Sequence, residues 1–132
     1  MTISIRRDRS GPMKHRIEVR NHTIVTDEPA ANGGEDAGPD PHDLYDAAVG
    51  ACKALTVLWY ANRKGIPVED IAVTVDRDAS EERNGTYRLK TGLNITGNLT
   101  DEQRQQLLSV ASRCPIHKLM TQVKTEIQTE WA

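Results

Sequence analysis

The sequence predicts a single α+β domain over residues 1–132, and three observations lead to this prediction. One long apolar stretch has helix-start and helix-stop signals, alternating residues on both sides of it predict strands, and turn residues join most of those strands directly. Strands joined mainly by hairpins favour an α+β fold over a doubly wound parallel sheet. A chain of 132 residues fits one domain, which buries only about two-thirds of its unfolded surface when it is alone.

Charge and composition exclude several classes of protein. Seventeen basic and nineteen acidic residues are dispersed along the chain, so no footprint for nucleic acid or an anionic membrane is present. No apolar run is long enough to span a bilayer and no signal core begins the chain, so we expect a cytoplasmic protein. Its two cysteines are not expected to form a permanent disulfide in that reducing compartment, which leaves a metal site, a redox couple or plain packing.

Residues 1–28 predict a three-stranded meander. Apolar and polar residues alternate there, and S-G-P at positions 10–12 and R-N at positions 20–21 supply the turns. The alternating apolar residues are Ile3, Ile5, Ile17, Val19 and Ile24. Residues 29–40 are rich in Gly, Pro and Asp and lack periodicity, so they predict either a shaped functional loop or a solvated linker.

Residues 41–64 predict the long helix around which the chain is organised. Asp40 is a suitable N-cap, Pro41 suits the first helical position, and Gly65 can adopt the left-handed conformation that ends a helix. Apolar or small residues occupy every side of the helical wheel, which a surface helix with one apolar stripe does not show. Its 24 residues span roughly 36 Å, so we expect a second copy of the chain to help cover it.

Residues 70–132 begin with a predicted hairpin. Apolar residues alternate before and after Asn84-Gly85, a dipeptide typical of a tight hairpin turn. The alternating residues are Ile71, Val73, Val75, Tyr87, Leu89, Leu93 and Ile95. Thr100 and Gln103 then form a capping box, which predicts a second helix ending near Arg113.

The end of the chain predicts a short helix and a last strand. Cys114 precedes Pro115, and the residue before a proline is disfavoured in the helical conformation. Cys114 is therefore predicted to be the N-cap of a helix over residues 115–122. Alternation at Val123, Thr125 and Ile127 predicts the last strand.

The two cysteines are the candidate reactive groups. Cys52 lies within the long helix, where a free cysteine is most often a small core residue. Cys114 differs, because the N–H groups and the dipole of a helix N-terminus stabilise a thiolate and lower the thiol pKa. The two residues are 62 positions apart, so only the fold can bring them together.

A zinc site is one alternative, in which His42 and His117 join Cys52 and Cys114, since Cys-x-x-His is a plausible ligand pair. His42 and Cys52, however, lie ten residues apart on one helix. The resulting rise of about 15 Å is too long for both to bind one ion within a chain. We therefore predict no metal.

Several arginines precede the long helix, and they are Arg6, Arg7, Arg9, Arg16 and Arg20. Such a group usually marks a solvated sheet face. An arginine is also the cation that a peroxide-reactive thiolate needs beside it, so these residues are candidates for that support.

Two motifs resemble those of the OsmC/Ohr family of thiol-dependent hydroperoxide reductases. The first is P-H-D-L-Y-D-A-A-V-G-A-C over residues 41–52, and the second is C-P-I-H-K over residues 114–118. The resemblance extends from Gly33 to Trp131. It implies an intertwined α+β homodimer, with antiparallel sheets around two long central helices and active sites between the chains. It also implies that Cys52 is the peroxidatic thiol, that Cys114 is the resolving thiol, and that no cofactor is bound.

One position departs from the better-studied members of that family. They place a glutamate ten residues before the first cysteine, where it holds an arginine from the N-terminal region, whereas this chain has His42 followed by Asp43. The residues expected to support the thiolate are therefore Arg9, Arg16, His42 and Asp43. The sequence is most similar to the OsmC-like branch of the family.

We therefore expect a homodimeric peroxidase that acts on small hydroperoxides and is recycled by an external dithiol. The apolar helix around Cys52 favours an organic hydroperoxide over hydrogen peroxide. The alternative is a non-enzymatic dimer of the same fold that acts as a redox sensor or binds a small apolar ligand.

Overall fold

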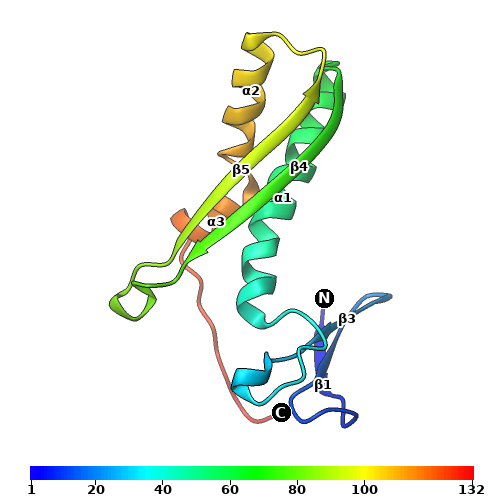
Figure 1. The fold of residues 1–132 in the computed structure, drawn as a ribbon, viewed down its shortest axis with the longest axis vertical. Coiled ribbons are helices and arrows are strands. Elements are labelled where there is room, and N and C mark those ends of the chain that lie inside the picture. Colours follow the sequence, from blue (N-terminus) through cyan, green and yellow to red (C-terminus); the bar gives the residue numbers. More distant parts are fainter. The chain divides into compact units, whose positions relative to one another are not determined.

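The computed structural model describes all 132 residues and confirms an α+β fold with antiparallel sheets. Its elements are β1 (Ile3–Arg7), β2 (His15–Val19), β3 (His22–Thr26), the 3-10 helix η1 (Ala30–Asn32), α1 (Pro41–Lys64), β4 (Val68–Asp78), the 3-10 helix η2 (Glu82–Asn84), β5 (Arg88–Gly97), α2 (Asp101–Ala111) and α3 (Pro115–Gln122) (Figure 1). The chain divides into two compact units, Met1–Tyr45 and Asp46–Ala132. Each unit is described by itself.

The first unit contains the predicted meander. Strands β1, β2 and β3 pair in sequence order, all antiparallel, and the register places Ile17 opposite Ile5 on one side and Ile24 on the other. Only two residues join β2 to β3, and Arg20 there adopts a left-handed φ of 52°. A turn this tight needs positive φ, which is costly for most residues other than glycine.

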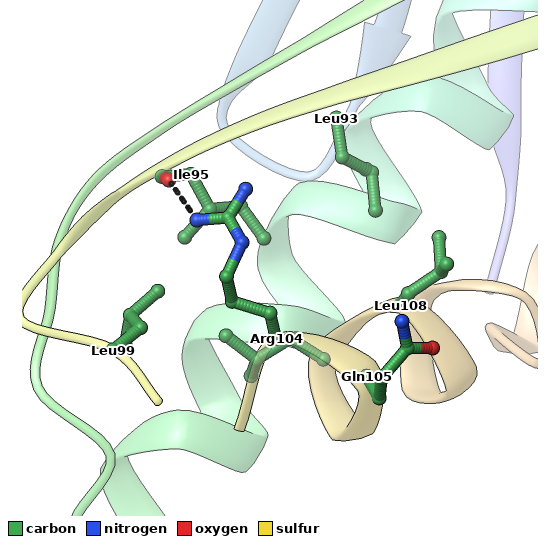
Figure 2. A pocket seen from close by; sticks show the side chains of 7 residues that line it. Leu93, Ile95, Leu99, Arg104, Gln105 and Leu108 are labelled. Atoms are coloured by element: carbon green, nitrogen blue, oxygen red, sulfur yellow. Dashed lines mark hydrogen bonds between the residues drawn. The ribbon is translucent and has the colours of Figure 1, made fainter. Parts of the chain in front are cut away.

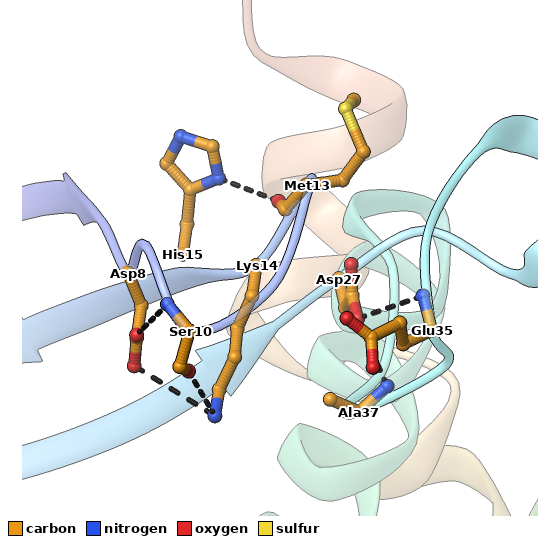
Figure 3. Close-up of polar contacts among 8 residues, drawn as sticks. All are labelled: Asp8, Ser10, Met13, Lys14, His15, Asp27, Glu35 and Ala37. Atoms are coloured by element: carbon orange, nitrogen blue, oxygen red, sulfur yellow. Dashed lines mark hydrogen bonds and ion pairs between the residues drawn. The ribbon is translucent and has the colours of Figure 1, made fainter.

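The Gly-rich segment after the meander folds into a shaped loop around Asp27. Asp27 is only 3% exposed, and its carboxylate accepts a hydrogen bond from the backbone N–H of Glu28 at 2.8 Å. It also accepts the N–H groups of Glu35 and Ala37 at 3.2 and 3.1 Å (Figure 3). The Ala37 bond contributes most to lowering the pKa of Asp27, against the opposing effect of burial. A side chain at Gly34 would place its Cβ 1.9 Å from the Glu28 carbonyl oxygen, so only glycine fits there.

In the second unit, α1 and α2 pack together against the β4–β5 hairpin. The buried centre of this core is formed by Val57, Ala61, Ile66, Leu107 and Ala111. Figure 1 shows the long hairpin crossing both helices. Gly50 marks the close approach of α1 to β4, because a Cβ at this position would lie 2.7 Å from Val75 Cγ2. None of the three α-helices combines the length and apolar character of a membrane span.

The local signals for the helices are confirmed. Helix α1 runs over Pro41–Lys64 as predicted, and Gly65 after it adopts a φ of 68°. Thr100 and Gln103 form both bonds of the capping box of α2. Helix α3 begins at Pro115 with Cys114 as its N-cap.

The predicted tight turn at Asn84-Gly85 is wrong in detail. Strands β4 and β5 are joined by residues 79–87, which contain η2. Gly85, at a φ of 94°, ends η2 and donates its N–H to the Glu82 carbonyl. The dipeptide therefore closes a short helix inside a longer connection, and Tyr87 precedes β5 instead of lying in it.

The predicted last strand is also wrong. Residues 123–132 form neither helix nor strand, and Ile127 is 81% exposed. Alternation alone does not make a strand, because its backbone N–H and C=O groups need the edge of a neighbouring strand. No strand of this chain pairs with the segment.

Candidate active site

The second unit brings the two cysteines together. Cys52 lies in the middle of α1, Cys114 precedes α3, and Cys52 is near enough to contribute to the pKa shift of the Cys114 thiol. The backbone N–H of Ile116 also donates a hydrogen bond to Cys52 Sγ at 3.4 Å. Both cysteines are free thiols. The first turn of α3 therefore lies directly against α1 at Cys52.

Cys52 is half-buried and has two polar neighbours. One is the Ile116 N–H, and the other is the Thr56 hydroxyl one turn further along α1, with Oγ1 3.8 Å from Sγ. Backbone N–H groups in the first turn of a helix favour negative charge nearby. Cys52 is thus partly exposed as a residue, whereas Cys114 is fully buried.

Cys114 is fully buried, and its pKa is raised rather than lowered. Burial is the largest cause; the backbone N–H of His117 and the positive charge of Lys53 oppose it, and the neighbouring Cys52 adds to it. The prediction that the helix N-terminus lowers this pKa is wrong, because loss of water outweighs the helix dipole and the thiol forms no regular N-cap hydrogen bond. Cys114 is therefore held as a protonated thiol at neutral pH.

Lys53 and His117 form a polar pair beside the thiols, and sequence reasoning did not assign it. The Lys53 side chain is buried, and its Nζ lies 2.8 Å from the Ala111 carbonyl oxygen and 2.9 Å from His117 Nδ1. A charged ammonium only donates, so Nδ1 accepts and the ring proton lies on Nε2. The available signal was a single lysine in an otherwise apolar helix, immediately after Cys52.

Asp46 is the other buried charge of α1, and it holds this helix to the sheet. Its carboxylate pairs with the Arg77 guanidinium and accepts a hydrogen bond from the Tyr87 hydroxyl at 2.6 Å. Burial, followed by this hydrogen bond, raises the pKa of Tyr87 to about 12. Each charge that an apolar helix buries here thus has a partner.

Within the single chain, no group of three or more His, Cys, Asp or Glu side chains is placed to hold a metal ion, and His117 Nδ1 lies 2.9 Å from Lys53 Nζ.

The four residues expected to support the thiolate lie in the first unit, whereas both cysteines lie in the second. Arg16 is paired with Arg6 across β1 and β2. Asp40 caps the start of α1, since its carboxylate accepts the Asp43 N–H, and the Asp43 carboxylate accepts the Asp40 N–H in return. The support of Cys52 by Arg9, Arg16, His42 or Asp43 stays a prediction.

A cavity of about 260 Å³ lies between β5 and α2 (Figure 2). Its lining consists of Leu93, Ile95, Leu99, Arg104, Gln105, Leu107 and Leu108. The lining is mostly apolar, with the Arg104 side chain donating to the Ile95 carbonyl oxygen at 3.5 Å. Neither cysteine lines this cavity.

With this fold and a paired-thiol site, the chain belongs to the OsmC-like protein family, which matches residues 33–130. A solved OsmC-like protein from Mycoplasma pneumoniae is 18% identical with a TM-score of 0.73, and the match covers 92% of this chain and 87% of that one. An organic hydroperoxide resistance protein OsmC from Legionella pneumophila is 24% identical with a TM-score of 0.63, covering 92% and 90%. The organic hydroperoxide resistance protein OhrB of Bacillus subtilis is 23% identical with a TM-score of 0.59, also covering 92% and 90%. Comparison with curated protein sequences finds no match.

Proposed function

We propose that this protein is a thiol-dependent peroxidase that reduces organic hydroperoxides in preference to hydrogen peroxide. The observation that carries the proposal is the pair of free thiols where the start of α3 meets the middle of α1, with Cys52 half-buried and Cys114 fully buried. Membership of the OsmC-like family supports a peroxide-related role, as do two structurally similar proteins named for organic hydroperoxide resistance.

In the proposed cycle the Cys52 thiolate attacks the terminal oxygen of ROOH. The O–O bond breaks, and Cys52 takes the terminal OH group and becomes a sulfenic acid. The alkoxide RO⁻ leaves and takes up a proton from water to become the alcohol ROH. The Cys114 sulfur then attacks the sulfenic sulfur, an S–S bond forms, and the hydroxyl leaves as water. An external dithiol reduces the disulfide by thiol exchange and is itself oxidised to a disulfide.

The accessibility of the two thiols supports this division of roles. A peroxide must reach the attacking sulfur, and only Cys52 is partly exposed. Cys114 is fully buried and kept protonated by the raised pKa described above, so it is protected from the bulk oxidant while remaining within reach of Cys52. Its burial therefore suits the second step better than the first.

The test compares Cys52→Ser with Cys114→Ser in a peroxide consumption assay with a dithiol. Cys52→Ser is expected to abolish turnover. Cys114→Ser is expected to reduce about one equivalent of peroxide per chain and then stop, because the sulfenic acid has no resolving partner. Thr121→Ser serves as a control for a hydroxyl in α3 away from the thiols. Full turnover in Cys52→Ser would contradict the proposal.

One observation favours a second candidate, a non-enzymatic dimer that binds a small apolar ligand. The cavity between β5 and α2 is mostly apolar and is separate from the cysteines. Two results together would favour that function. A fluorescent fatty-acid probe would bind wild type but not Leu108→Glu, and wild type would consume no peroxide. A redox-sensor role is distinguished by disulfide formation without turnover.

A further inference from the structure

We propose that Lys53 is the cation that supports Cys114 during disulfide formation and that His117 positions it. This inference rests on the proposed peroxidase function. The family resemblance implies that an N-terminal arginine supports the peroxidatic thiol, Cys52. The inference made here concerns the resolving thiol, Cys114, and assigns its support to a residue of α1.

The first step of the argument is burial. Lys53 is 4% exposed and Cys114 is not exposed at all, so little water separates or screens them. A buried ammonium is costly unless acceptors surround it, and Lys53 has two, the Ala111 carbonyl oxygen and His117 Nδ1. An ammonium has three N–H groups, so one remains that neither acceptor uses.

The second step is the arrangement of the elements. Lys53 follows Cys52 on α1, while His117 belongs to the first turn of α3, which begins after Cys114. The Lys53–His117 contact therefore joins the two elements that carry the thiols. The Ala111 carbonyl oxygen also accepts the backbone N–H of Cys114 at 3.4 Å, so Lys53 Nζ and Cys114 meet at the same carbonyl group. From there the positive charge of Lys53 favours the Cys114 thiolate, against the effect of burial.

The chemistry of resolution needs such a charge. Cys114 must lose its S–H proton as its sulfur attacks the Cys52 sulfenic sulfur, and the leaving hydroxide takes up a proton to become water. The net charge of Cys52 and Cys114 together is thus unchanged over the step. The Cys114 thiolate that forms transiently is balanced by the Lys53 ammonium. The groups that face Cys114 are Cys52 and Lys53 from α1 and His117 from α3.

The test follows two steps in a single turnover, namely trapping of the Cys52 sulfenic acid and appearance of the Cys52–Cys114 disulfide. Lys53→Met is expected to slow disulfide formation about tenfold more than it slows sulfenic acid formation. The reason is that loss of the cation lowers the fraction of Cys114 present as thiolate. Lys53→Arg keeps the charge and is expected to restore most of the rate. Equal slowing of both steps, or of neither, would overturn the assignment. Lys53→Gln replaces Lys53→Met if the latter does not fold.

A second measurement does not need peroxide. In the Cys52→Ser protein the ultraviolet absorbance of the thiolate reports Cys114, the one remaining cysteine, and adding Lys53→Met is expected to move its titration midpoint upward. If Lys53→Met raises the titration midpoint of Cys114 but the wild-type protein reduces no peroxide, the Lys53 assignment holds and the proposed function fails. If the wild-type protein is an active peroxidase but Lys53→Met leaves the midpoint unchanged, only the Lys53 assignment is overturned.

Discussion

At the scale of single residues, Asp27 determines the shape of the Gly-rich loop. Its carboxylate accepts three backbone N–H groups, and its Oδ2 atom alone accepts those of Glu35 and Ala37. Asp27→Asn is expected to loosen residues 29–40, because an amide NH₂ placed at that position would face two donors. Faster hydrogen exchange at the Glu35 and Ala37 amides would report the change. Asp36→Asn, in the same loop, is the control and should leave both amides protected.

The same residue predicts how the loop responds to pH. The folded pKa of Asp27 is lowered, so its contribution to stability is fully present above the unfolded value of about 3.9. That contribution is lost as the pH falls through the lower folded pKa. Hydrogen exchange of the loop in wild type should therefore accelerate, after correction for the intrinsic rates, only in acid. Asp27→Asn should show no such acid transition, and an identical transition in both proteins would contradict the assignment.

The residues of the candidate site differ in how far the sequence predicts them. Cys52 and Cys114 are found by motif resemblance, and Cys114 as an N-cap follows from the proline after it. The sign of its pKa shift is not predictable from the helix terminus, because burial depends on how α3 packs against α1. Lys53 is missed for the same reason, since only the fold places it beside His117.

At the scale of elements, local capping signals decide where the helices begin. The bonds between Thr100 and Gln103 fix the start of α2, which carries the fully buried Leu107. Thr100→Ala is expected to lower the free energy of unfolding by about 1 kcal/mol, the usual cost of losing an N-cap. Denaturant unfolding measures it, with Asn98→Ala just outside the helix as the control. A loss no larger than that of the control would show that the box does not stabilise α2.

Elements that depend on a partner are the ones that sequence reasoning places incorrectly. The ends of α1, α2 and α3 follow from residues within one turn of each end, such as Pro41 and Thr100. The connection over residues 79–87 is longer than a tight turn because η2 forms within it, and the segment over residues 123–132 has no strand of this chain beside it. A turn dipeptide and alternation reveal neither fact, so the prediction of a tight turn and of a last strand failed.

At the scale of the whole molecule, one chain does not cover α1. Leu55 and Trp59 are 68% and 60% exposed, and Arg63 covers only one face of the Trp59 ring, with 5.0 Å between the guanidinium carbon and the ring centroid. Adjacent apolar side chains of this size on one helix mark an interaction surface when they are contiguous. This exposed face is where a second copy of α1 would lie in the expected homodimer, which stays a prediction.

A single substitution on this face tests whether the dimer is also a condition of activity. Leu55→Glu is expected to convert the protein to monomers in analytical ultracentrifugation, because a carboxylate buried between two helices has no partner there. Loss of peroxidase turnover should accompany dissociation if the partner chain supplies the groups that cover Cys52, with Arg9, Arg16, His42 and Asp43 as the candidates. Leu108→Glu changes a leucine of α2 that is 51% exposed, and as a control it should alter neither property. A wild-type monomer with full activity would show that one chain builds the whole site.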